Sequence, residues 1–186
     1  MIYGGPTMKK LNINGMTDLC KLAINYGTDK VPKLGHTYTP YYHGLFKNRR
    51  ESVKKVLEIG ILSGASLFMW RDYFPNAEIY GIDIQAIELD SPRIHCFKYD
   101  QTDAKQLQSF IDTAGDNFDL IVDDGSHRSN DQIFTANFLR KYLSSVGIYV
   151  IEDVRFPNRV SRKTLGTIVD LGKTRLHPRD NRLVIL

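Results

Sequence analysis

The sequence is poor in cysteine and contains no long apolar run. Two cysteines, Cys20 and Cys96, stand among 186 residues, which is too few for a disulfide scaffold and lacks the paired spacing of a zinc site. No apolar stretch reaches the roughly 18 residues that span a membrane, and polar residues interrupt the N-terminus where a secretory signal needs an apolar segment. These absences favour a reduced, cytoplasmic protein, and 42% hydrophobic residues suffice for a globular core.

The net charge is small and unevenly distributed. The chain carries a formal +4 at pH 7 and has a pI near 9.0, which alone would suggest a nucleic-acid-binding protein. From residue 155 to the end, however, eight Arg and Lys residues stand against two Asp residues, so this stretch carries +6 and the rest is slightly acidic. The basic stretch could meet an anionic substrate, such as a nucleotide-linked sugar, or a partner subunit.

Apolar periodicity predicts strands that alternate with helices. We expect strands at 56–60, 78–83, 93–99, 118–122 and 147–151, and helices at 17–24, 66–73, 103–113, 131–143 and from about residue 41. This alternation predicts an α/β fold whose parallel sheet is covered on both faces. Segments 174–176 and 182–186 flank a turn and predict a closing hairpin. We therefore expect a flexible lead at 1–15 within an N-terminal cap (1–49), followed by the main domain (50–186).

The first predicted strand ends in Glu58-Ile-Gly60 and leads through Gly64 and Ser66 into a helix. Glycines at such a turn let the backbone approach a ligand at the helix N-terminus. The spacing is G-x-x-x-G and not the G-x-G-x-x-G of dinucleotide binding, and the acidic Glu58 disfavours a pyrophosphate. A ligand with an amine or cationic end fits better. The alternative is a plain strand-to-helix turn.

Acidic and amide side chains follow the next two predicted strands. Asp83 ends the second strand, where a carboxylate can accept hydrogen bonds from both hydroxyls of a ribose. Asp100 or Gln101, after the third strand, could bind an adenine edge. The alternative is that this segment simply begins a helix, capped by Thr102 or Asp103. Together with the glycine motif, these residues indicate a ligand that contains a nucleoside.

Four carboxylates gather at the ends of the last two parallel strands. Asp123 and Asp124 follow one strand, and Glu152 and Asp153 follow the other. Because neighbouring strand ends lie about 5 Å apart, these acids should share a small volume, which a Mg²⁺-like cation would stabilise. His127 could face the same cavity as a general base. The alternative is that the acids are solvated loop residues and His127 caps a helix.

These motifs together resemble those of the class I S-adenosylmethionine-dependent methyltransferases, over about residues 50–186. The resemblance implies a Rossmann-like sheet of seven mostly parallel strands with an antiparallel last strand, in a three-layer α/β/α arrangement. It also implies the cofactor S-adenosylmethionine. The residues expected to bind it are Glu58, Gly60, Gly64, Ser66, Asp83, Asp100, Gln101, Asp123 and Tyr38.

A closer resemblance is to the metal-dependent, mycinamicin-type sugar O-methyltransferases. It rests on separated segments: Gly27-Thr28-Asp29-Lys30, His36-x-Tyr38, Asp100-Gln101-x-Asp103, Asp124-Gly-Ser-His127 and Ile151-Glu152-Asp153. The resemblance implies that Asp124, Glu152 and Asp153 bind Mg²⁺ and that His127 is the catalytic base. Tyr38 could form part of a lid near the sulfonium, where an aromatic ring attracts a cation, or simply pack the N-terminal segment onto the sheet.

The expected function is Mg²⁺-dependent methyl transfer from S-adenosylmethionine to a hydroxyl of a small molecule, above all a sugar or glycan. Three alternatives remain open: an RNA or catechol-like methyltransferase, a nicotinamide-dependent oxidoreductase, and a non-catalytic nucleic-acid-binding module. The expected partner is a sugar-containing substrate. Neither nucleic acid nor a membrane is expected, and a homo-oligomer is compatible with the sequence.

Overall fold

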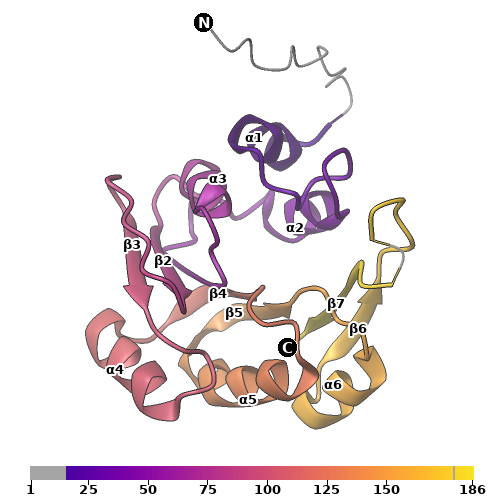
Figure 1. The fold of residues 1–186 in the computed structure, drawn as a ribbon. Coiled ribbons are helices and arrows are strands. Elements are labelled where there is room, and N and C mark those ends of the chain that lie inside the picture. Colours follow the sequence, from indigo (N-terminus) through magenta and orange to yellow (C-terminus); the bar gives the residue numbers. More distant parts are fainter. Residues whose placement is uncertain (1–15, 178) are drawn as a thin grey trace, which may run out of the picture.

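Strands alternate with helices along residues 16–177 and 179–186, which a computed structural model describes (Figure 1). The strands are β1 (Lys55–Ile59), β2 (Glu78–Asp83), β3 (Ile94–Lys98), β4 (Phe118–Asp123), β5 (Leu143–Ile151), β6 (Thr167–Asp170) and β7 (Arg182–Ile185). The α-helices are α1 (Asp18–Tyr26), α2 (Tyr38–Phe46), α3 (Ala65–Tyr73), α4 (Ala104–Ala114), α5 (Ser129–Leu139) and α6 (Pro157–Thr164). The predicted flexible lead lies outside the described residues, and none of the described helices combines the length and apolarity needed to cross a bilayer.

The strands form one seven-stranded sheet in the order β3-β2-β1-β4-β5-β7-β6. The first five of these pair in parallel, whereas β7 runs antiparallel to both β5 and β6. The predicted mostly parallel sheet with an antiparallel last strand is therefore confirmed. The chain order reverses between β1 and β4, and sheets of this kind bind ligands at the carboxyl ends of the strands at such a reversal.

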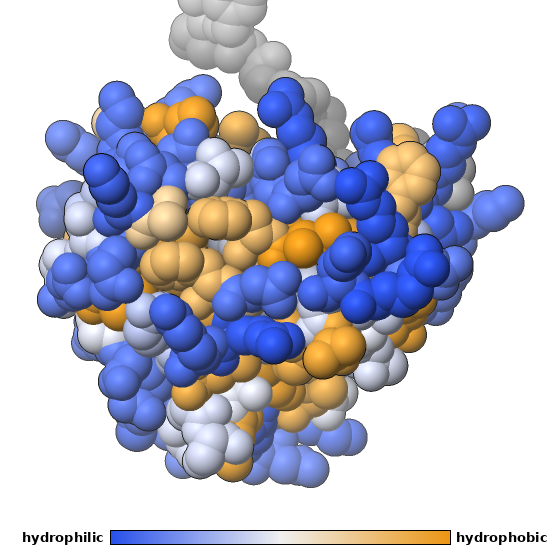
Figure 2. All heavy atoms as spheres, turned by 90° about the horizontal axis from the view of Figure 1, so that it is seen from below, coloured by the Kyte–Doolittle hydropathy of each residue, from blue (hydrophilic) through white to orange (hydrophobic). Residues whose placement is uncertain are grey.

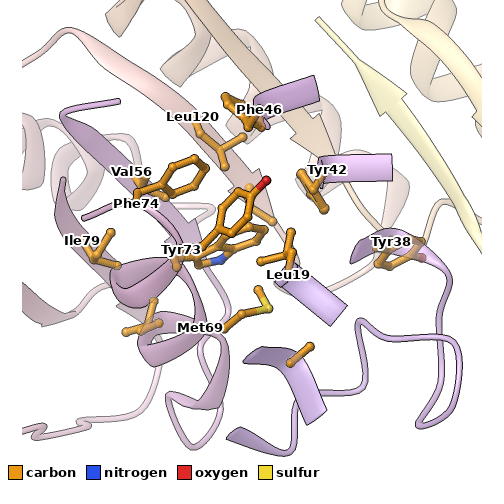
Figure 3. Close-up of a cluster of buried hydrophobic side chains, with 14 of the residues drawn as sticks. Leu19, Tyr38, Tyr42, Phe46, Val56, Met69, Tyr73, Phe74, Ile79 and Leu120 are labelled. Atoms are coloured by element: carbon orange, nitrogen blue, oxygen red, sulfur yellow. The ribbon is translucent and has the colours of Figure 1, made fainter. Parts of the chain in front are cut away.

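Helices cover both faces of the sheet, as predicted for three layers. Helices α1, α2 and α3 lie over one face, and α4, α5 and α6 over the other (Figure 1). Each face has its own buried apolar cluster. In the first cluster, Leu19 and Tyr42 from the N-terminal helices meet Tyr73 and Phe74 from the α3 region and Leu120 from β4 (Figure 3). The N-terminal helices therefore share a core with the sheet.

Polar side chains and glycines set the helix ends. The Thr17 hydroxyl accepts a hydrogen bond from the Cys20 backbone N–H at 3.2 Å, which confirms the predicted cap of α1. Gly27 ends that helix with φ +77°, a conformation that glycine adopts without strain. The Asp103 carboxylate accepts two backbone N–H groups of α4 at 2.8 and 3.2 Å. Of the two alternatives, Asp103 and not Thr102 caps this helix.

The closing hairpin exists, but its first strand lies earlier than predicted. Thr167–Asp170 forms β6, whereas 174–176 lies in the connection to β7. Gly172, with φ +79°, follows β6 by two residues. The Asn181 side chain then donates hydrogen bonds to the carbonyls of Leu171 at 3.2 Å and Gly172 at 2.8 Å. These contacts hold the segment between the strands as a loop.

Three helices differ from the expectation. Helix α5 ends at Leu139 and is followed by a short 3-10 helix (Arg140–Tyr142), so that β5 begins at Leu143 and not near residue 147. The other two are α6 and α2.

Helix α6 was not predicted, because Val160 is its one buried apolar side chain and a single residue shows no period. Pro157 occupies its first turn, where proline is well tolerated. Helix α2 begins at Tyr38 and not near Tyr41. Pro40 falls within its first turn, where the backbone N–H has no helical partner to lose.

Candidate functional site

Three carboxylates at the ends of β1, β4 and β5 converge on one lysine. Lys30, in the loop between α1 and α2, places its Nζ 2.5 Å from an Asp124 oxygen, 2.5 Å from a Glu152 oxygen and 3.2 Å from a Glu58 oxygen. Lys30 is 2% exposed, and Glu58 and Glu152 are completely buried. Ion pairs of Lys30 therefore link the loop between α1 and α2 to the ends of three strands.

Burying these charged groups is unfavourable, and the pKa values of Lys30, Glu58 and Glu152 shift in response. Burial alone would lower the pKa of Lys30, but the three carboxylates raise it well above its usual value, so the ammonium group stays charged. Burial raises the pKa of Glu152 and of Glu58, and Lys30 opposes that rise in both. One positive charge meets three acidic groups, so Lys30 compensates only part of the negative charge at the strand ends.

Asp124, His127 and Asp153 form a group that could hold a metal ion. One ligand atom of each lies within 4.8 Å of those of the other two. His127 Nδ1 lies 4.0 Å from Asp124 Oδ1, and its Nε2 lies 3.8 Å from Asp153 Oδ2. His127 Nδ1 is buried without a hydrogen-bond partner. Asp124 thus turns one oxygen to Lys30 and presents the other to His127.

Glu152, the third predicted metal ligand, faces inward. Lys30 Nζ lies 2.5 Å from its Oε2, and the Tyr42 hydroxyl donates a hydrogen bond to its Oε1 at 2.6 Å. The structure therefore brings Asp124 and Asp153 together with the predicted base His127, and places Glu152 behind them, where it supports Asp124 through Lys30.

The backbone around the group is held in uncommon conformations. His127 and Asp153 have φ values of +56° and +53°, in a region that residues other than glycine rarely adopt. Such strain concentrates at functional sites. The Tyr38 hydroxyl donates to Asp153 Oδ1 at 2.5 Å and accepts from the Asp153 backbone N–H at 3.2 Å. His36 Nε2 lies 3.3 Å from the same oxygen. Tyr38, expected near the cofactor, thus positions Asp153.

A cavity of about 470 Å³ opens at the carboxyl ends of the strands where the sheet order reverses. It lies beside the metal-binding candidates, because the loop between Asp124 and α5 forms part of its wall. Four of the predicted cofactor residues line it: Gly60, Asp83, Asp100 and Gln101. The residues of the wall that sequence reasoning did not identify include Tyr99, Ser126, Arg128 and Asp131.

Gly60 has φ +81°, and a Cβ atom at this position would lie 2.3 Å from the Asp124 carbonyl oxygen. Only glycine allows the two strand ends to approach so closely. Asp83 Oδ2 accepts hydrogen bonds from the backbone N–H groups of Ile61 at 3.0 Å and Leu62 at 3.2 Å. The Asp83 carboxylate therefore also holds the turn that follows Gly60 against β2.

Gln101, which lines the cavity, forms a buried network with Asp123, which lies behind it. The Gln101 amide donates to Asp123 Oδ1 at 3.2 Å and to the Thr135 hydroxyl at 3.1 Å, and accepts from the Ser126 N–H at 2.8 Å. Burial raises the pKa of Asp123 to about 6, and the Tyr149 hydroxyl lies 3.2 Å from its Oδ2. The Gln101 amide is thus engaged in shaping the wall, and Asp123 does not line it.

The remaining predicted cofactor residues gather at the start of α3, outside the wall of the cavity. Glu58 accepts a hydrogen bond from Trp70 Nε1 at 3.0 Å and a further one from Ser66. Gly64 precedes α3 with φ +80°. Glu58, Gly64 and Ser66 therefore stabilise the turn between β1 and α3.

Lys30 is the site residue that sequence reasoning missed. It belongs to the Gly27–Lys30 segment noted for its resemblance, but no role followed from that segment. Its carboxylate partners Asp124 and Glu152 lie 94 and 122 residues away along the chain, beyond any local pattern. One signal was available, because four acids at adjacent strand ends require cations, and a lysine can supply one of them.

The known proteins that this chain resembles are methyltransferases. A sequence model of the FtsJ-like methyltransferase family matches residues 33–152, more than half of the chain. Over 145 residues the chain is 38% identical to the 8-demethyl-8-(2-methoxy-alpha-L-rhamnosyl)-tetracenomycin-C 3'-O-methyltransferase of Streptomyces olivaceus, a match that covers 74% of this chain and 37% of that protein. Over 147 residues it is 37% identical to the mycinamicin VI 2''-O-methyltransferase of Micromonospora griseorubida, covering 74% and 36%.

A solved structure agrees with these relatives. The chain is similar to the MycE methyltransferase of the mycinamycin biosynthetic pathway in complex with Mg, SAH and mycinamycin VI, with a TM-score of 0.67 and 34% identity. That match covers 77% of this chain and 39% of the other. The chain therefore spans little more than a third of the length of the curated relatives that it matches.

Proposed function

The chain belongs to the S-adenosylmethionine-dependent methyltransferases of the FtsJ-like family, and we propose that it transfers a methyl group to a sugar hydroxyl with the help of Mg²⁺. The observation that carries this proposal is the Asp124–His127–Asp153 group beside a cavity at the reversal of the sheet. The two relatives are O-methyltransferases of a rhamnosyl tetracenomycin and of mycinamicin VI, which supports a sugar as acceptor. Family membership favours methyl transfer over hydride transfer.

The side chains at the strand ends fit a divalent cation. Mg²⁺ prefers carboxylate oxygens and keeps several waters, and Asp124 and Asp153 would hold it through the oxygens that face His127. Burial and the neighbouring Asp124 charge raise the pKa of Asp153, as expected for a carboxylate that needs a further counter-charge. Glu152, also proposed as a ligand, would have to exchange its contact with Lys30 or Tyr42 for the ion.

The cavity would hold S-adenosylmethionine. We assign Gly60 to the close backbone approach, Asp83 to the ribose hydroxyls and Asp100 to the adenine end, all three on the wall of the cavity. Gln101 would act through its hydrogen bonds to the loop that follows β4. Glu58, Gly64, Ser66 and Asp123 would act from behind the wall, by holding the turns and side chains that form it. Tyr38 would act on the neighbouring Asp153, to which its hydroxyl is hydrogen-bonded.

His127 is the proposed base. A bound divalent cation would lower the pKa of a substrate hydroxyl, as metal ions do for bound water. His127 would accept the proton on its imidazole ring, and the carboxylates of Asp124 and Asp153, 4.0 and 3.8 Å from its two nitrogens, would stabilise the resulting imidazolium. Holding the hydroxyl and the cofactor on neighbouring strand ends would orient the two reactants, which supplies much of the acceleration in such reactions.

A methyl-transfer assay tests the proposal. Radiolabelled S-adenosylmethionine is offered with rhamnosides and other glycosides, catechol or RNA, in Mg²⁺ or in excess chelator. We expect labelled glycoside in Mg²⁺ alone, and a loss of about 10²–10⁴ in turnover for His127→Ala. Binding of S-adenosylhomocysteine to that variant, measured by calorimetry, should stay close to wild type.

The matched control is His95→Ala, because His95 lies on β3 and pairs with Glu78 at the sheet edge. This variant should keep full activity. Undiminished turnover in chelator, full activity of His127→Ala, or methylation of RNA alone would contradict the proposal.

A further inference from the structure

A second hollow, of about 610 Å³, lies between α6, β6 and β7. Four arginines line it, and we refer to it as the arginine groove: Arg155, Arg159, Arg162 and Arg182. The most hydrophilic side chains on the helical face seen in Figure 2 gather on the side where α6 lies in Figure 1. The basic C-terminal stretch thus concentrates much of its charge in one hollow.

The positive charge of the arginine groove is largely uncompensated. Asp170 is the acidic residue among its lining side chains, and its Oδ2 lies 3.2 Å from Arg182 Nε. The other three guanidinium groups form no ion pair with a carboxylate within the described part of the chain. Guanidinium groups stay charged and present a planar fork of donors that matches phosphate oxygens. The uncompensated guanidinium groups of the arginine groove are therefore suited to phosphate oxygens.

The arginine groove adjoins the proposed active site. Arg155 follows the candidate metal ligand Asp153 by two residues. Arg159 Nη2 donates a hydrogen bond to Asn130 Oδ1 at 2.5 Å, and Asn130 stands in the first turn of α5, three residues after His127. A ligand with its phosphate in the arginine groove would therefore extend toward the metal-binding side chains.

Phe156 adds an apolar surface to the arginine groove. Its side chain is 64% exposed, although phenylalanine is usually buried, and it lies between Arg155 and the first turn of α6. Exposed aromatic rings beside basic side chains stack on nucleobases in many proteins that bind nucleotides. Phe156 thus favours a ligand that carries a base as well as phosphate.

We propose that the arginine groove binds the phosphate of the acceptor, so that the substrate is a phosphorylated sugar. Two sources share this chemistry: a glycosyl phosphate, and a nucleoside diphosphate sugar whose base would stack on Phe156. A hollow of about 610 Å³ suits a ligand of this size. The inference rests on the proposed sugar O-methyltransferase function and names the class of substrate for the same site.

Calorimetry with the full chain compares methyl glucoside, glucose 1-phosphate and UDP-glucose. Each phosphate-bearing probe should bind at least about tenfold more tightly than the neutral glycoside, the ratio expected for one charge-assisted hydrogen bond. Arg155→Gln and Arg159→Gln should each weaken UDP-glucose at least about tenfold. The control Arg179→Gln, in an exposed arginine of the basic stretch outside the groove, should bind as wild type. Phe156→Ala separates the sources, because it should weaken UDP-glucose and spare glucose 1-phosphate.

Three results would overturn the inference. These are equal affinity for the neutral and the phosphorylated sugars, wild-type affinity in both groove variants, and tighter, steeply salt-dependent binding of a short RNA that the same variants abolish. If neutral glycosides are methylated in Mg²⁺ while phosphate binding is absent, the proposed function stands and the groove assignment fails. If UDP-glucose binds in the groove and no sugar is methylated, the proposed function fails instead.

Discussion

Replacing Lys30 with methionine tests whether this lysine holds the strand ends together. Methionine has a similar length and no charge, so the change leaves Glu58 and Glu152 completely buried without their cation. Removing one partner of a buried ion pair destabilises a protein by about 3–5 kcal/mol. With two buried partners we expect about 4 kcal/mol, which corresponds to a fall of about 2 M in the urea midpoint at a slope of about 2 kcal/mol per M.

Urea unfolding followed by circular dichroism at pH 7.5 measures this effect. The matched control is Lys105→Met, in an exposed lysine in the first turn of α4, whose midpoint should stay near wild type. The double variant Lys30→Met/Glu152→Gln removes one of the stranded charges and should recover part of the loss. A midpoint for Lys30→Met within about 0.3 M of wild type would refute the argument, because the carboxylates would then not depend on the ammonium group.

Two further predictions concern the backbone at Gly60 and the cap of α4. Gly60→Ala should abolish binding of S-adenosylhomocysteine in calorimetry, since its Cβ would lie 2.3 Å from the Asp124 carbonyl oxygen at φ +81°, whereas Gly44→Ala, with no atom within 4 Å of the added Cβ, should bind normally. Hydrogen bonds from the backbone of α4 lower the pKa of Asp103, so its contribution to stability is complete above about pH 4 and is lost as the pH falls through the lowered pKa. Asp103→Asn keeps a cap without a charge, and the difference in urea midpoint between wild type and this variant should therefore shrink between pH 6 and pH 3.

The central sheet could be predicted because its signals are local. A strand buried on both faces must be apolar throughout, as Leu120, Ile121 and Val122 are, and the chain must turn where the apolar run ends. Acids placed at those turns, such as Asp124 and Asp153, come together because parallel strands align their carboxyl ends at one edge. The meeting of these side chains follows from general rules of parallel sheets, whereas the seven strands and the antiparallel last strand are implied by the resemblance to the methyltransferases.

The contacts that could not be predicted are those between distant segments of the chain. Lys30 lies in a loop whose sequence has no period, and its place depends on how α1 and α2 pack on the sheet. The inward turn of Glu152 follows from Lys30 and from the Tyr42 hydroxyl, which are both remote in sequence. Helix α6 has one buried apolar residue, Val160, and is stabilised by packing against α5 and β7. A pattern within the sequence cannot contain this information.

Some carboxylates of the site contact Lys30 and others face His127, and this difference determines how strongly folding depends on the metal. Lys30 already compensates part of the charge of the inner carboxylates Glu58 and Glu152, whereas Asp124 Oδ1 and Asp153 Oδ2 face His127 and not the lysine. Many small metal-binding domains unfold when the metal is removed. Here we expect excess chelator to abolish methyl transfer while the urea midpoint of the wild type falls by no more than about 0.7 M. An ion at ten times its dissociation constant stabilises the folded state by about 1.4 kcal/mol, which gives this limit.

Adding Mg²⁺ to Lys30→Met should raise the urea midpoint more than adding it to the wild type, since the ion would then meet carboxylates that have lost their lysine. If the same concentration of Mg²⁺ raises the urea midpoint of both proteins equally, the charge of Lys30 does not influence the metal site and the argument is wrong.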